Sequence, residues 1–226
     1  GESSMIHYQR SSIDDLDKIF RINLINSASG YKSANLIGTR DDLGVAILAV
    51  FSSIIHMGSN PPLLGFILRP TKVARHTYSN IKDNSYYTIN HIAYNFAKQA
   101  HHTSAKYESD VSEFEVTGLT EEHLNDFHAP FVKESPVKMG MRFVEEHKIE
   151  SNGTILVIGE ILDLYVKEEL LEDDGFVNLS KGKVVCINGL DGYSLPNQPK
   201  RFGYQRPLDT PSESTREKQG SSLNLT

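Results

Sequence analysis

Small polar and basic residues gather at the ends of apolar runs in this chain of 226 residues. Hydroxyl and guanidinium groups bind phosphate through charge-assisted hydrogen bonds, while amide and backbone groups pair with the polar edge of a ring. Such a set indicates a site for an anionic cofactor, although most Ser, Thr and Asn residues at strand ends are turn and cap residues. The set comprises Ser33, Asn35, Ser52, Ser53, His56, Ser59, Arg69, Arg75, His76, Thr77, Asn80 and Ser104.

Strong catalytic motifs are missing from the sequence, which has no GxGxxG after a strand, no Walker loop, no HExxH and no GxSxG. The nine His residues have no metal-ligand spacing, since neighbours such as His101 and His102 point apart on a helix or strand. The only cysteine, Cys186, lies in an apolar stretch typical of a buried thiol. We therefore expect no metal site, no disulfide and no side-chain nucleophile.

The composition is that of a globular protein, with 38% apolar and 23% charged residues. A formal net charge of -6 and the lack of a long basic run argue against nucleic acid as a partner. No stretch approaches a signal peptide or a membrane span, so we expect a cytoplasmic protein without membrane contact. We predict an N-terminal extension over residues 1–19, one domain over residues 20–208, and a disordered polar tail over residues 209–226.

Strands dominate the expected secondary structure. Apolar runs alternate with turn residues over residues 31–70, and residues 41–44 fit a hairpin connection in which Gly44 takes a positive φ. Residues 137–143 and 154–167 predict long strands joined by a turn at residues 150–153. Short connections favour antiparallel pairing, which predicts a mainly β protein built as an antiparallel β-barrel.

A few helices are expected to cover this barrel. Residues 75–84 form a polar helix-like segment, and residues 90–102 carry apolar side chains at helical spacing. Thr120, followed by two glutamates, resembles a helix N-cap, so a short helix is predicted over residues 120–127.

A series of segments between residues 20 and 195 is too specific in order and spacing to arise by chance. The segments are GYKSANLIGTRDDLGVAILAVFSSIIHMGSNPPLLGFILRP, RHTYSNI, YYTINHI and HHTSAKY, followed by SEFEVTGLT, APFVKESPVKMGM, NGTILVIGEI and INGLDGY. Together they closely resemble the flavin reductase-like family, whose fold is the FMN-binding split barrel and which includes flavoredoxin-like proteins. The resemblance implies an antiparallel split β-barrel with a few covering α-helices.

The resemblance also implies an FMN held at the interface of a homodimer. On this analogy Ser33, Asn35, Ser52 and Ser53 line the flavin, and Arg69, Arg75, His76, Thr77 and Asn80 hold its phosphate and ribityl chain. His101 and Ser104 would approach the ring from a later segment. Many relatives have an acidic residue where this chain has His76. The analogy assigns no catalytic residue.

The activity implied is that of an oxidoreductase, in which NAD(P)H is the transient electron donor and FMN passes the electrons to free flavin, a redox partner protein or another acceptor. The missing dinucleotide fingerprint is compatible with this activity, because relatives bind nicotinamide by stacking it over the flavin. A flavin-binding electron carrier or sensor without NAD(P)H oxidation is the alternative. A pyridoxamine phosphate oxidase shares the barrel, but its additional basic residues are not evident here.

Overall fold

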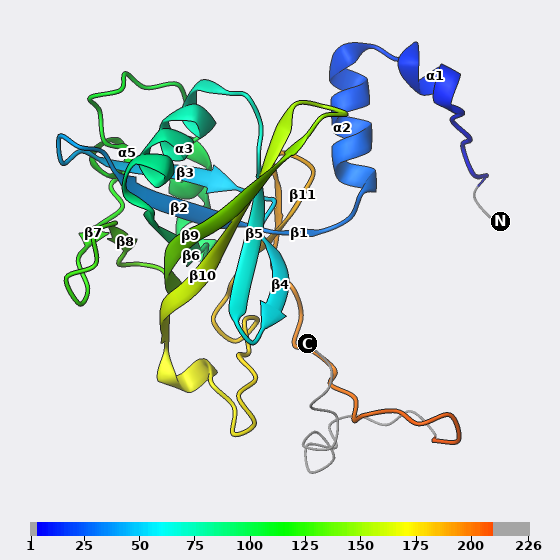
Figure 1. Cartoon of the computed structure of the whole chain (residues 1–226). Helices are drawn as coiled ribbons and strands as arrows, with labels where there is room; N and C mark the ends of the chain where they lie inside the picture. The colour runs from blue at the N-terminus through cyan, green and yellow to red at the C-terminus, as the bar shows by residue number, and fades with distance from the viewer. Residues whose placement is uncertain (1–3, 210–226) are drawn as a thin grey trace.

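One antiparallel sheet of seven strands dominates the computed structural model, which describes residues 4–209 (Figure 1). Apart from Asp209, the predicted tail lies outside the described residues. The sheet has the order β3-β2-β6-β9-β10-β5-β4. Its strands are β2 (Asn35–Arg40), β3 (Ala46–Phe51), β4 (Ile55–Ser59), β5 (Pro62–Leu68), β6 (Tyr86–His91), β9 (Val137–Ile149) and β10 (Thr154–Val166). The predicted antiparallel, mainly β fold is therefore confirmed.

Two small sheets extend this framework. The short strand β1 (Lys32–Ser33) leads into β2 and pairs with β11 (Cys186–Asn188), which pairs in turn with β12 (Gly192–Ser194). Strands β7 (Glu121–Glu122) and β8 (Phe131–Val132) form a separate two-stranded sheet. Strand β1, near the start of the domain, and strand β11, near its end, thus lie side by side next to the start of β2.

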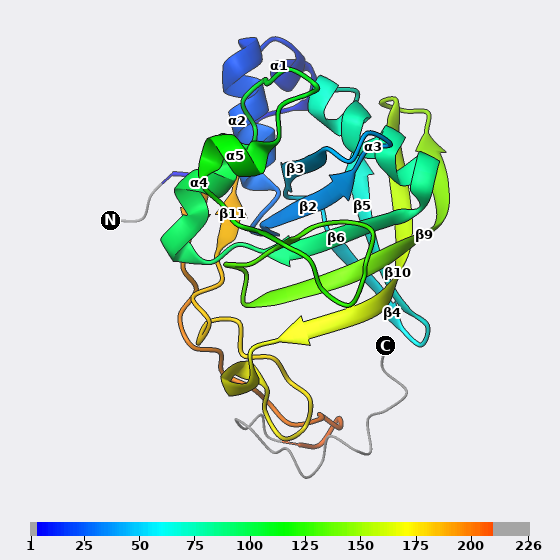
Figure 2. The same cartoon turned by 90° about the vertical axis from the view of Figure 1, so that its left-hand side faces the viewer.

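The helices cover the sheet unevenly. Helix α3 (Lys72–Asn84) packs against β2, β3, β5 and β6, whereas α4 (Ala97–His102) and α5 (Glu113–Thr117) contact β3 (Figure 2). Helices α1 (Arg10–Asp14) and α2 (Lys18–Ala28) have no buried residue, and they stand beside the sheet in Figure 1. Two 3-10 turns occur at Tyr94–Phe96 and Glu168–Leu170. Within residues 4–209, no helix has the length and apolar character needed to cross a bilayer.

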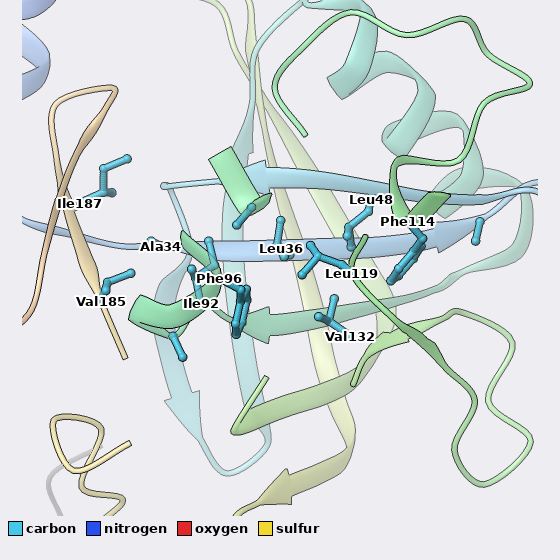
Figure 3. Close-up of a cluster of buried hydrophobic side chains, with 13 residues drawn as sticks. Ala34, Leu36, Leu48, Ile92, Phe96, Phe114, Leu119, Val132, Val185 and Ile187 are labelled. Atoms are coloured by element: carbon cyan, nitrogen blue, oxygen red, sulfur yellow. The ribbon is translucent and has the colours of Figure 1, made fainter. Parts of the chain in front are cut away.

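Alternating side chains along the strands create two cores. Ile37 belongs to the cluster with Phe66 and Tyr87, while its neighbour Leu36 belongs to the cluster on the other face of the strand. Figure 3 shows this second cluster, where Phe96 and Phe114 come from the segments that cover β2 and β3. Both faces of β2 are covered, so every residue from Asn35 to Thr39 is buried.

The two hairpins predicted from the sequence are confirmed. Gly44 has φ +84° in the β2–β3 turn, and Gly153 has φ +71° in the β9–β10 turn, a conformation that glycine adopts without steric cost. Strand β9 continues well beyond the predicted end at residue 143 and reaches Ile149. This extension makes β9 and β10 the long central ribbon of the sheet.

The helix predicted over residues 120–127 is wrong. The Thr120 backbone N–H and hydroxyl both donate to the Glu134 carboxylate, and Glu121 pairs with Val132 in an extended ladder. These long-range bonds engage the Thr120 hydroxyl and the backbone groups of Glu121, which a helix would need for its cap and its first turn. Tertiary contacts therefore override the local cap signal. The helix predicted over residues 90–102 is confirmed only from residue 97, since β6 ends at His91.

Candidate cofactor site

A polar strip begins where β1 passes into β2. The fully buried Asn35 donates from Nδ2 to the Ser33 hydroxyl at 2.6 Å. Asn35 is also paired across the ladder with Phe51, the last residue of β3. Ser52 and Ser53 directly follow Phe51, so the four polar residues predicted to line the ring belong to the same end of the sheet. Their contact with a flavin stays a prediction.

Ser53 closes the corner between β3 and β5. Its hydroxyl accepts from the Ile67 N–H at 3.0 Å and donates to the Ile67 carbonyl at 3.1 Å. This pair of bonds lies two residues beyond the Ile55–Gly65 pair, at the end of the β4–β5 ladder. Arg69 lies two residues after Ile67. The Ser53–Ile67 hydrogen bonds therefore connect the polar strip to the segment that carries Arg69 and Arg75.

Two arginines line a cavity of about 210 Å³ at the N-terminal end of α3. Arg69 follows the end of β5, and Arg75 projects from the first turns of α3. Thr71 is the N-cap of the helix, and its hydroxyl accepts from the Ala74 N–H at 3.3 Å. The rest of the lining is mostly apolar and comes from Leu68, Pro70, Ala74, Gly153 and Ile155. Tyr78 also lines the cavity, and its hydroxyl donates to the Glu146 carboxylate at 2.8 Å.

The electrostatics of this cavity suit an anion. Within residues 4–209, neither Arg69 nor Arg75 has an ion pair or a side-chain hydrogen bond to neutralise its charge. The unpaired N–H groups and the dipole at the start of α3 add further positive potential. The donor set therefore fits a phosphate group, whose oxygens accept several charge-assisted hydrogen bonds at once.

Three other residues of α3 that are predicted to hold the phosphate and ribityl chain have their contacts outside this cavity. His76 faces the β2–β3 turn, with Nε2 lying 4.0 Å from an Asp41 carboxylate oxygen. Asn80 is buried and donates to the Thr39 hydroxyl at 3.0 Å, which joins α3 to β2. Thr77 is fully buried, and its hydroxyl has no hydrogen-bond partner among the described residues.

The predicted placement of Thr77 near the start of a helix is wrong. Helix α3 begins at Lys72, so the Thr77 N–H lies inside the helix rather than among the free donors of its first turn. Thr71, as the N-cap, and the first turn of α3 after it form the helix start at which Thr77 was expected.

His101 lies in the last turn of α4 and contacts the β11–β12 hairpin, and Ser104 follows the helix. His101 Nδ1 is 3.0 Å from the Tyr193 hydroxyl, and the two rings meet edge to face at 5.5 Å. Burial, followed by the charge of Asp191, raises the pKa of Tyr193 to about 12. Ser104 is exposed and donates to the His101 carbonyl. Their approach to a bound ring stays a prediction, as does any role for His56 and Ser59 on the exposed edge strand β4.

Sequence reasoning missed His91, the last residue of β6. Its Nδ1 lies 2.6 Å from Asn35 Oδ1, so the imidazole extends the polar strip by one residue. Burial lowers the pKa of His91 to about 4, and the ring is therefore neutral at ordinary pH. Only the strand pairing of Asn35 with His91, which no local motif reveals, could have indicated this contact.

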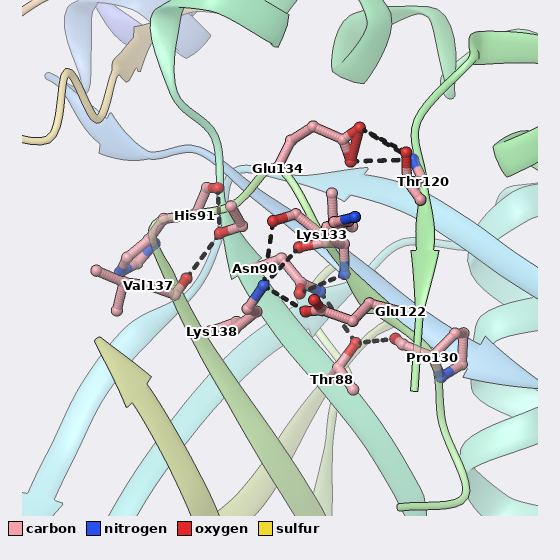
Figure 4. A network of polar contacts seen from close by, with 12 residues as sticks. Thr88, Asn90, His91, Thr120, Glu122, Pro130, Lys133, Glu134, Val137 and Lys138 are labelled. Atoms are coloured by element: carbon pink, nitrogen blue, oxygen red, sulfur yellow. Dashed lines mark hydrogen bonds and ion pairs between the residues drawn. The ribbon is translucent and has the colours of Figure 1, made fainter. Parts of the chain in front are cut away.

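A buried polar network holds this end of β6 in place (Figure 4). The Asn90 amide donates to the Leu36 carbonyl and accepts from the Val132 N–H, at 3.1 and 2.9 Å. Lys138 pairs with Glu122 at 2.6 Å beside it. The Ser135 hydroxyl donates to the His91 carbonyl at 2.7 Å. Since each polar group has a partner, the His91 backbone has little freedom to move.

The described part of the chain contains none of the usual ligand sets of metal sites. Among residues 4–209, no group of three or more His, Cys, Asp or Glu side chains is arranged to hold a metal ion. Cys186 is half-buried, and its thiol donates a long hydrogen bond of 3.7 Å to the Ser194 carbonyl.

The seven-stranded antiparallel sheet, with the arginine-lined cavity beside α3, is the architecture of a split-barrel protein. Residues 31–184 match the model of the flavin reductase like domain. A solved structure from Shewanella frigidimarina, described as a flavin reductase with split barrel domain, is 48% identical and superposes with a TM-score of 0.86. The alignment covers 89% of this chain and 100% of the Shewanella chain. The chain therefore belongs to the flavin reductase-like family.

Two more distant structures share the fold. Nitrilotriacetate monooxygenase component B from Bacillus cereus is 18% identical with a TM-score of 0.76, over 88% of this chain and 98% of its own. Flavoredoxin from Desulfovibrio vulgaris is 23% identical with a TM-score of 0.65, over 79% of this chain and 91% of its own. The fold is therefore shared by chains of low sequence identity.

Proposed function

We propose that this protein is an FMN-binding oxidoreductase that moves electrons from NAD(P)H through FMN to an acceptor. The observation that carries the proposal is the cavity lined by Arg69 and Arg75. The hydrogen bonds between Ser53 and Ile67, two residues before Arg69, link this cavity to the polar strip of Ser33, Asn35, Ser52 and Ser53. A single elongated ligand with a phosphate at one end and a polar ring at the other matches this pair of features. Membership of the flavin reductase-like family supports a flavin as that ligand.

The residues of this chain bind and orient the cofactor. Arg69 and Arg75 donate charge-assisted hydrogen bonds to the phosphate, and the first turn of α3 adds backbone donors. Ser33 presents a hydroxyl to the ring. The bound flavin supplies the electron transfer itself, so no side chain has to act as a nucleophile or a general base. Asn80 fixes α3 to β2 and thereby fixes the distance between the two ends of the site.

The direct test is a titration of the purified protein with FMN and with riboflavin, followed by NADH and NADPH oxidation assays with added FMN. Micromolar or better binding of FMN, with weaker binding of riboflavin, is the expected result. Absence of FMN binding in both oxidising and reducing buffer would refute the proposal. Binding of FMN without oxidation of either nucleotide would identify an electron carrier or sensor, and chemical reduction of the bound flavin would then show that the site is redox-active.

We further propose a homodimer in the cytoplasm with the FMN sites at the subunit boundary. Large apolar side chains are exposed on α2 and β10: Ile19 is 64% exposed, Phe20 50% and Leu164 56%. A protein interface would bury such exposed apolar side chains. Light scattering at micromolar concentration should give twice the monomer mass, and a monomeric mass would contradict the dimer while leaving FMN binding open.

A further inference from the structure

A chain of two short hydrogen bonds runs from the end of β6 to the start of the barrel. His91 Nδ1 and Asn35 Oδ1 are 2.6 Å apart, and Asn35 Nδ2 lies 2.6 Å from the Ser33 hydroxyl oxygen. His91 and Asn35 are directly paired across the β2–β6 ladder, so their side chains leave the sheet on the same face. Asn35 is fully buried, whereas Ser33 and His91 keep part of their surface accessible.

The chemistry of the Asn35 amide decides which group donates and which accepts in each of these two hydrogen bonds. Its oxygen only accepts, and the neutral imidazole therefore carries its proton on Nδ1 and donates to it. The amide nitrogen only donates, so it uses the Ser33 oxygen as acceptor. The Ser33 proton is then free to point away from Asn35. Turning the amide by 180° would reverse both bonds and would make Ser33 a donor to Asn35 instead.

We propose that His91 is a positioning residue that acts through Asn35 to fix Ser33 as a hydrogen-bond donor toward the bound cofactor. This inference rests on the proposed FMN function, since the donor needs an acceptor on the flavin ring. His91 does not touch the cofactor in this scheme. Its role is to hold the Asn35 amide in one of its two orientations.

The test is a double-mutant cycle on FMN affinity, measured by quenching of flavin fluorescence. Ser33→Ala should weaken FMN binding about fivefold, the usual effect of losing one neutral hydrogen bond. His91→Phe keeps a ring of similar size without the donor, and it should weaken binding by a similar factor. In the Ser33→Ala background, His91→Phe should have no further effect, because both changes remove the same hydrogen bond.

Two further variants separate positioning from a structural role. His91→Gln retains an N–H donor for Asn35 and should bind FMN nearly as well as the parent protein. Asn35→Asp provides only acceptors, so Ser33 must donate inward, and FMN affinity should fall to the Ser33→Ala level. The absorption spectrum of bound flavin should change in the same way in Ser33→Ala, His91→Phe and Asn35→Asp.

The outcomes are distinguishable. Equal weakening by His91→Phe in both backgrounds, or no weakening in either, overturns the positioning role while the FMN proposal stands. Unchanged binding in Asn35→Asp means that the amide has the reverse orientation and also overturns it. A parent protein that fails to bind FMN refutes the proposed function. A His91→Phe protein that does not fold leaves His91→Gln and Asn35→Asp to decide, since loss of affinity in the Gln variant contradicts the proposal.

Discussion

Removal of the two arginines at the start of α3 should leave the proposed FMN site unable to distinguish FMN from riboflavin. Arg69 and Arg75 line the same cavity, and neither charge is neutralised within residues 4–209. One charge-assisted hydrogen bond to phosphate contributes about 1.5 to 3 kcal/mol, which corresponds to roughly ten- to a hundredfold in affinity. We therefore expect Arg69→Ala and Arg75→Ala each to weaken FMN at least tenfold.

Riboflavin provides the matched ligand because it has the ring and the ribityl chain but lacks the phosphate. Its affinity should change less than twofold in either single variant, by about 0.4 kcal/mol at most. Arg10→Ala is the matched control variant, since Arg10 forms an exposed ion pair with Asp14 on α1 and its loss changes the net charge equally. Calorimetric titration at two ionic strengths should show a smaller salt dependence for FMN in the cavity variants.

The result that refutes this reasoning is specific. If Arg69→Ala and Arg75→Ala weaken both flavins equally, the arginines support the fold of the β5–α3 corner rather than the phosphate. If only Arg75→Ala abolishes the preference for FMN, Arg69 is not a ligand although the cavity is still the phosphate site. If the double variant retains the preference, the phosphate lies elsewhere.

Three titratable side chains yield further predictions. Tyr87→Phe should raise the free energy of unfolding by about 1 kcal/mol in urea melts, because the buried Tyr87 hydroxyl has no partner within residues 4–209; a loss of stability would reveal an undetected partner. Glu113→Ala should cost about 1 to 3 kcal/mol, since the Leu48 N–H, which donates to the Glu113 carboxylate at 2.8 Å, is left unpaired, whereas Glu113→Gln should be nearly neutral. Burial raises the pKa of Glu113, so the Gln variant should also lose less stability than the parent as the pH rises. His91 has its pKa lowered from 6.5 to about 4, so folding is favoured by the neutral ring above pH 6.5 and should weaken by up to about 3 kcal/mol as the pH falls to 4; His91→Gln should remove this part of the pH dependence.

The strands could be predicted because their signals are local. Residues 31–70 alternate apolar runs with turn residues, and Gly44 and Gly153 occupy the turns that need a positive φ. Thr120 had an equally clear local signal for a helix, yet its donors bind Glu134, 14 residues away. Local patterns therefore succeed where no distant group competes for the same hydrogen bonds.

The basic end of the site stays a prediction, and the structure restricts which of its residues lie together. Arg75, His76 and Thr77 are consecutive, and consecutive residues on an α-helix point about 100° apart. They cannot all face one phosphate once α3 includes them. In the structure Arg75 lines the cavity, the His76 imidazole lies near the Asp41 carboxylate, and Thr77 is buried in the core. Helical geometry alone would have reduced this set, had the start of the helix at Lys72 been recognised.

His91 could not be predicted, because it meets Asn35 only through the register of two strands 56 residues apart in sequence. A slip of one residue would turn the imidazole to the other face of the sheet. The register is set two residues further along the ladder, where Ile37 pairs with Ile89 and both side chains are fully buried in the barrel core. Packing of these two isoleucines therefore also fixes the alignment of His91 with Asn35. The alignment of the hydrogen bonds between His91, Asn35 and Ser33 is thus a consequence of packing in the hydrophobic core. A substitution at Ile37 or Ile89 that lets the strands slip would break these hydrogen bonds, although neither isoleucine contributes to them.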